Sequence, residues 1–125
     1  MHYEFKYYSD KQILEIITIG EFPKEILNAL AEEGLEQLKK YNCYRYLLNY
    51  TELSNIIGIF DMYERPTEAS RIGITNRYAI ALLTTEKHYE QIKFAETVYR
   101  NRGYKYKVFI DKNEAIKFLA DDDKE

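Results

Sequence analysis

Residues 78–119 read YAIALLTTEKHYEQIKFAETVYRNRGYKYKVFIDKNEAIKFL, and this stretch decides the fold class. The apolar run Tyr78–Leu83 predicts a buried strand, and the amphipathic segment that starts at Thr85 predicts a long helix. A second strand, Tyr104–Ile110, and a last helix opened by Asp111 follow after short connections. Strands that alternate with helices in this way are typical of a parallel sheet with helical crossovers.

The segment before this stretch begins with two strands and then continues the same alternation. We expect strands over Tyr3–Tyr8 and Gln12–Ile19, a helix over Pro23–Tyr41, a strand over Cys43–Asn49, a loop over Tyr50–Leu53 and a helix from Ser54 to about Glu64. Ser54 is expected to cap that second helix and Pro66 to end it. The predicted class is therefore α/β, a five-stranded mixed and mostly parallel sheet with four helices in the order β-β-α-β-α-β-α-β-α.

Length and composition limit the domain organisation and the cellular context. The chain has 125 residues, 46% of them hydrophobic and 31% charged, which indicates one globular domain, expected over residues 1–120, and an acidic tail over 121–125. A single cysteine, Cys43, and the lack of a signal-peptide pattern after Met1 favour a cytoplasmic location. The apolar runs are far too short to predict a membrane span.

Patterns of catalysis, metal binding and nucleic-acid binding are weak throughout the sequence. The two histidines and the one cysteine lack the spacing of a zinc site, and no phosphate loop or nucleophile elbow occurs. Residues 102–109 imitate an RNA-recognition octamer, but Lys105 and Lys107 stand where that motif requires a small residue and a valine. The net charge of −3 also disfavours nucleic acid. We therefore expect no catalytic residue, no metal, no cofactor and no nucleic-acid partner.

The element order and the closing pattern resemble those of a known bacterial family. The residues that carry the resemblance are Asn101-Arg102-Gly103-Tyr104, Val108-Phe109, Asp111 and Glu114-Ala115-Ile116-Lys117-Phe118-Leu119, which look like the corresponding part of STAS-like proteins, small domains related to anti-sigma factor antagonists. Regulatory members of that family carry a phosphorylatable serine at the helix that follows the third strand. Ser54 falls at this place, with Leu53 where the family has aspartate. The resemblance implies phosphorylation of Ser54, whereas a simple helix cap is the alternative.

These observations lead to a functional expectation and to a candidate contact surface. We expect a non-catalytic STAS-like regulatory or protein-interaction module that acts through a partner protein or through self-association. The alternative is a module that binds a small apolar ligand or lipid beneath the second helix; RNA binding and enzymatic activity rank lower. Sites gather at the carboxyl ends of parallel strands, and the next helix is apolar nearly all round. The candidate binding residues are Tyr50, Thr51, Ser54, Ile57, Asp61 and Met62.

Overall fold

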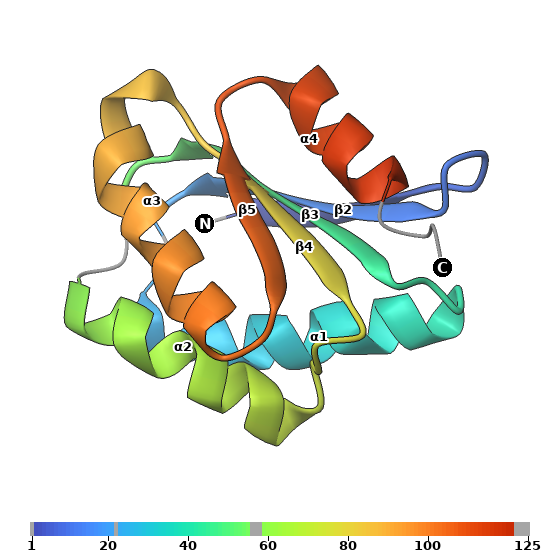
Figure 1. Cartoon of the computed structure of the whole chain (residues 1–125), viewed down its shortest axis with the longest axis horizontal. Coiled ribbons are helices and arrows are strands. Elements are labelled where there is room, and N and C mark those ends of the chain that lie inside the picture. Colours follow the sequence, from blue (N-terminus) through green and yellow to red (C-terminus); the bar gives the residue numbers. More distant parts are fainter. Residues whose placement is uncertain (1, 22, 56–58, 122–125) are drawn as a thin grey trace.

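The computed structural model describes residues 2–21, 23–55 and 59–121, and for residues 59–63 it describes the backbone alone. Strands and helices alternate along this part of the chain after an initial pair of strands (Figure 1). In chain order the elements are β1 (His2–Tyr8), β2 (Ile13–Gly20), the 3₁₀ turn η1 (Lys24–Ile26), α1 (Leu27–Lys40), β3 (Arg45–Leu53), α2 (Ile59–Ile72), β4 (Ala79–Leu83), α3 (Glu86–Asn101), β5 (Lys105–Phe109) and α4 (Lys112–Ala120).

All five strands belong to one sheet with the order β1-β2-β3-β4-β5. β1 runs antiparallel to β2, and each later neighbour is parallel, so the expected mixed α/β sheet with four helices is confirmed. The register places Leu14 opposite Tyr46, Tyr46 opposite Ile80, and Ile80 opposite Tyr106. These four side chains belong to one core cluster, so a single row of buried residues crosses the parallel part of the sheet.

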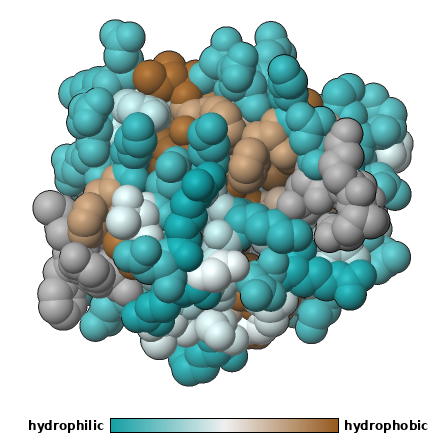
Figure 2. All heavy atoms as spheres, in the orientation of Figure 1, coloured by the Kyte–Doolittle hydropathy of each residue, from teal (hydrophilic) through white to brown (hydrophobic). Residues whose placement is uncertain are grey.

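The helices form two layers of unequal size on the sheet. α1, α2 and α3 cover one face, and α4 lies on the opposite face (Figure 1). Right-handed crossovers between neighbouring parallel strands put the three connecting helices on the same side, while α4 follows the last strand and is not bound by this rule. A smaller core cluster, which includes Leu47, Ala81 and Leu119, lies beneath α4. Apolar side chains remain visible between β5 and α4 (Figure 2).

The last helix begins as its sequence predicts. The Asp111 side chain accepts hydrogen bonds from the backbone N–H groups of Asn113 at 2.8 Å and Glu114 at 3.4 Å. These bonds satisfy two of the donors that a helix N-terminus leaves without an intrahelical partner. The sequence signal at Asp111 is therefore confirmed in its atomic detail.

Three expectations for the middle of the chain are wrong. Residues 50–53 continue β3 rather than forming a loop, because β2 is long enough to pair with them: Glu52 lies opposite Ile19. α2 begins at Ile59, beyond Ser54, and continues through Pro66 to Ile72. Pro66 is fully buried, and packing of this kind outweighs the single hydrogen bond that a proline removes from a helix.

Candidate functional site

The most prominent internal feature is a cavity beneath α2. This helix makes its main contacts with α1 and α3, which flank it, and few with the strands below. The space left between α2 and the sheet is a cavity of about 130 Å³. Protein interiors are packed as tightly as organic crystals, and voids larger than a water molecule are few. The described side chains therefore leave this part of the core unfilled.

The cavity wall is mainly apolar and comes from every layer on this side of the sheet. The strands supply its floor, α1 and α3 its sides, and α2 part of its roof. The described lining residues are Ile16, Thr18, Leu27, Leu30, Ala31, Tyr46, Leu48, Tyr50, Leu53, Asn55, Arg65, Ala69, Ile74, Ile80, Leu82, Ile92, Ala95, Tyr99 and Tyr106. An apolar pocket with a few polar groups is the usual composition of a small-molecule site.

Four tyrosines bring hydroxyl groups into this wall. Tyr99 and Tyr106 stack with their ring centroids 4.1 Å apart and an angle of 5° between the ring planes. Tyr46 reaches its place because Gly34, in α1, has no side chain: a Cβ atom at Gly34 would lie 2.3 Å from the Tyr46 hydroxyl oxygen. Burial raises the pKa of Tyr46, Tyr50, Tyr99 and Tyr106, so all four hydroxyls stay protonated at neutral pH.

Arg65 is the charged residue of the described lining, and α1 holds it in position. Its Nη1 donates a hydrogen bond of 2.7 Å to Asn28 Oδ1, and Asn28 Nδ2 donates one of 3.2 Å to Glu68 Oε1. The guanidinium also acts on the tyrosines, since it lowers the pKa of Tyr50 and Tyr99 against the larger effect of burial. A cation and tyrosine side chains therefore share one mainly apolar cavity.

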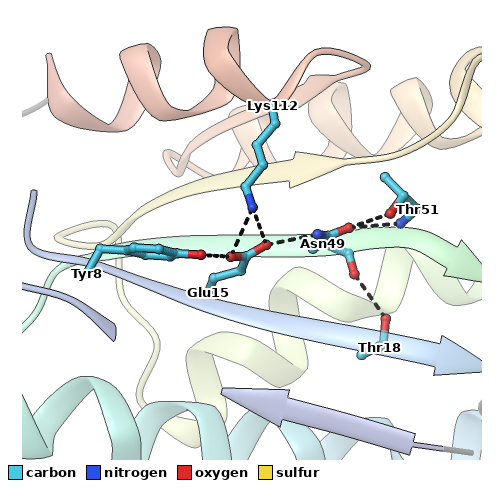
Figure 3. Close-up of polar contacts among 6 residues, drawn as sticks. All are labelled: Tyr8, Glu15, Thr18, Asn49, Thr51 and Lys112. Carbon is cyan, nitrogen blue, oxygen red and sulfur yellow. Dashed lines mark hydrogen bonds and ion pairs between the residues drawn. The ribbon is translucent and has the colours of Figure 1, made fainter. Parts of the chain in front are cut away.

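A second polar cluster lies across the sheet from this cavity, beneath the start of α4 (Figure 3). Its centre is Glu15, a fully buried carboxylate in β2. Tyr8 donates a hydrogen bond of 2.6 Å to Glu15, Asn49 donates one of 2.8 Å, and Lys112 lies 3.3 Å away. The bond to Glu15 is the main cause that raises the pKa of Tyr8 to about 12. Buried charges are tolerated when they are paired and hydrogen-bonded in this way.

The Glu15 cluster connects several elements rather than opening to a pocket. Tyr8 comes from β1, Asn49 from β3 and Lys112 from α4, so one carboxylate joins three strands and a helix. Asn49 continues the chain of contacts, because its Oδ1 accepts a hydrogen bond of 2.7 Å from the Thr51 hydroxyl. With three donors on the carboxylate, the arrangement stabilises the fold on the α4 side of the sheet.

The structure divides the predicted site residues between different places. Tyr50 lines the cavity, whereas the Thr51 side chain belongs to the Glu15 cluster. Ser54 is exposed and directly follows β3, and its backbone N–H donates to the Gly20 carbonyl oxygen at 2.9 Å. α2 begins at Ile59, so Ser54 is not its cap. Ile57 lies outside the described residues. Asp61 and Met62 belong to α2, where the structure describes only their backbone.

The sequence carried one signal for the Glu15 cluster and little for the cavity. Glu15 interrupts the run Ile13-Leu14-Glu15-Ile16-Ile17, and a charge inside an apolar strand indicates a paired, buried group. Arg65 and Tyr99 have no such signal, because charged and aromatic residues are common on helices. Cys43 is buried, and its Sγ lies 3.2 Å from the Gln12 carbonyl oxygen, so this thiol is part of the core.

Across residues 2–21, 23–55 and 59–121 no group of three or more His, Cys, Asp or Glu side chains could hold a metal ion. No described helix combines the length and apolar character needed to cross a bilayer. No family model and no curated protein matches this chain.

Proposed function

We propose that this protein is a non-catalytic binding module that holds a small apolar ligand in the cavity beneath α2. The observation that carries the proposal is the cavity itself, about 130 Å³ of space with a mainly apolar wall in the middle of the larger core. An engineered apolar cavity of about 150 Å³ stays free of water and binds benzene. A ligand with the bulk of one aromatic ring, or of a short alkyl chain, is therefore the size that fits.

The position of the cavity favours ligand uptake over a simple packing defect. α2 rests on its neighbouring helices, so small displacements of this one element would open the space without breaking the sheet. Larger Leu, Ile or Val side chains could fill the same space, because cores tolerate hydrophobic repacking when their total volume fits. The three alanines in the wall, Ala31, Ala69 and Ala95, leave room that larger residues would take.

The test of this proposal fills the cavity and compares binding. In Ala31→Leu the new side chain should occupy the cavity and abolish binding of 4-fluorotoluene, measured by fluorine NMR titration, while the protein stays folded by circular dichroism. Ala29→Leu is the matched control, because Ala29 lies on the exposed side of the same helix, and it should bind as the unsubstituted protein does. If the unsubstituted protein does not bind the probe, or if Ala31→Leu binds it equally well, the proposal is wrong.

A regulatory module of the STAS-like kind, acting through protein contacts, is the second candidate. The observation that favours it is an exposed apolar side chain next to the predicted phosphosite. Ile19 is 37% exposed and lies opposite Glu52, and the next residue, Gly20, accepts a hydrogen bond from Ser54. If the surface around Ile19 mediates self-association, Ile19→Lys should lower the molar mass of the protein measured by light scattering. If the unsubstituted protein and Ile19→Lys both have the mass of a monomer, this second candidate is contradicted.

A further inference from the structure

We propose that the cavity selects a ligand with a small anionic head group, a carboxylate, and that Arg65 binds this group together with the hydroxyls of Tyr50 and Tyr99. This inference rests on the proposed function and gives the ligand its chemical class. The apolar part of the wall would contact the body of the ligand, and the polar part of the wall would bind the carboxylate.

The charge pattern of the wall is the first support. Arg65 is a cation, and the described lining residues include no aspartate or glutamate. Arg65 already bonds to Asn28 and Tyr99, and a neutral apolar ligand would offer no acceptor to its remaining N–H groups. A carboxylate instead forms the charge-assisted pair for which the planar guanidinium is best suited.

The second support is that Arg65 is held in place before any ligand arrives. Asn28, from α1, accepts one of its hydrogen bonds, and Glu68 in turn accepts one from Asn28. A guanidinium has five N–H donors, more than one amide oxygen can accept. A group that is already oriented loses less conformational entropy when it binds a ligand.

The third support is that the hydroxyl groups of Tyr50 and Tyr99 can donate hydrogen bonds to a carboxylate and carry no negative charge that would repel it. Burial raises the pKa of Tyr50 and Tyr99, so both remain neutral hydrogen-bond donors at physiological pH. Arg65 lines the same cavity as the two tyrosines, and its charge opposes the effect of burial on both pKa values. One carboxylate could therefore accept from the guanidinium and from a hydroxyl, an arrangement that satisfies both of its oxygens.

The experiment compares two probes of nearly the same shape, 4-fluorobenzoate and 4-fluorotoluene, by fluorine NMR titration. The unsubstituted protein should bind 4-fluorobenzoate at least about tenfold more tightly, the usual effect of one hydrogen bond to a charged group. Arg65→Met keeps an unbranched, mainly aliphatic side chain and removes the guanidinium with its charge. This variant should lose about tenfold or more in affinity for 4-fluorobenzoate and keep its affinity for 4-fluorotoluene.

Two further variants complete the design. Arg77→Met is the matched control, because Arg77 is an exposed arginine that lies over the Tyr44 ring and is absent from the described lining. It should leave both affinities unchanged. Arg65→Lys keeps the charge without the planar fork, so an intermediate affinity for 4-fluorobenzoate is expected even if Arg65→Met does not fold.

The outcomes separate this inference from the function on which it rests. Equal binding of the two probes, tighter binding of 4-fluorotoluene, or an unchanged preference in Arg65→Met would overturn the anionic head group while leaving the apolar site in place. Failure of the unsubstituted protein to bind 4-fluorotoluene would overturn the proposed function itself.

Discussion

Replacing Glu15 by glutamine should destabilise the fold by about 2–3 kcal/mol, the sum of three contributions. The bonds from Tyr8 and Asn49 change from charged to neutral, which costs about 1 kcal/mol each. The Lys112 side chain is 44% exposed, so its ion pair contributes at most about 1 kcal/mol. Glutamine has nearly the same shape as glutamate, so no cavity contributes to the loss.

Denaturant unfolding monitored by circular dichroism would measure this loss. A change of about 2–3 kcal/mol corresponds to a fall of roughly 8–12 °C in the melting temperature of a domain of this size. The denaturant slope should stay the same, because the surface exposed on unfolding does not change. Lys112→Met is the matched comparison and should cost about 1 kcal/mol or less, since its charge is already partly in water.

The role of the charge itself can be isolated with a double-mutant cycle. Glu15→Gln combined with Tyr8→Phe should be less destabilising than the sum of the two single changes, with a coupling of about 0.5–3 kcal/mol. The pKa of Tyr8, raised to about 12 mainly by its bond to Glu15, should fall toward the ordinary value of 10.0 in Glu15→Gln. Additive effects, or a loss of stability below about 0.5 kcal/mol, would refute the assignment of Glu15 as the charged centre of this cluster.

Two more predictions concern buried tyrosines. Tyr104→Phe should lower the free energy of unfolding by about 1–3 kcal/mol, because the Ile74 carbonyl oxygen would lose the hydroxyl that donates to it. An unchanged denaturation midpoint would contradict this prediction. Alkaline pH should also destabilise the fold. Burial raises the pKa of Tyr46 and Tyr106 above the ordinary 10.0. The stability that these two groups contribute is therefore complete below pH 10 and is lost as the pH rises through their pKa values in the folded protein. Phenolate absorbance should show both groups ionising only as the protein unfolds, and early ionisation with the fold intact would argue against their burial.

Short-range signals explain which parts of the fold could be predicted. The Asp111 cap, the apolar run that became β4 and the amphipathic segment that became α3 each depend on residues within one or two turns of each other. Such patterns identify the element and its buried face wherever it packs. The same argument fails at β3 and α2. The length of β3 depends on β2, a partner about thirty residues earlier, and the continuation of α2 through Pro66 depends on burial by distant helices.

The α/β class and the order of the elements could be predicted from the sequence alone. This is possible because hydrophobic periodicity and capping are local properties of the chain. Only the tertiary structure decided that Tyr50 and Thr51 face opposite sides of the sheet, the first toward a cavity and the second toward a buried carboxylate. Cavities and charge clusters arise where separate elements meet, and the distance between α2 and the sheet is fixed by how α1, α2 and α3 pack together.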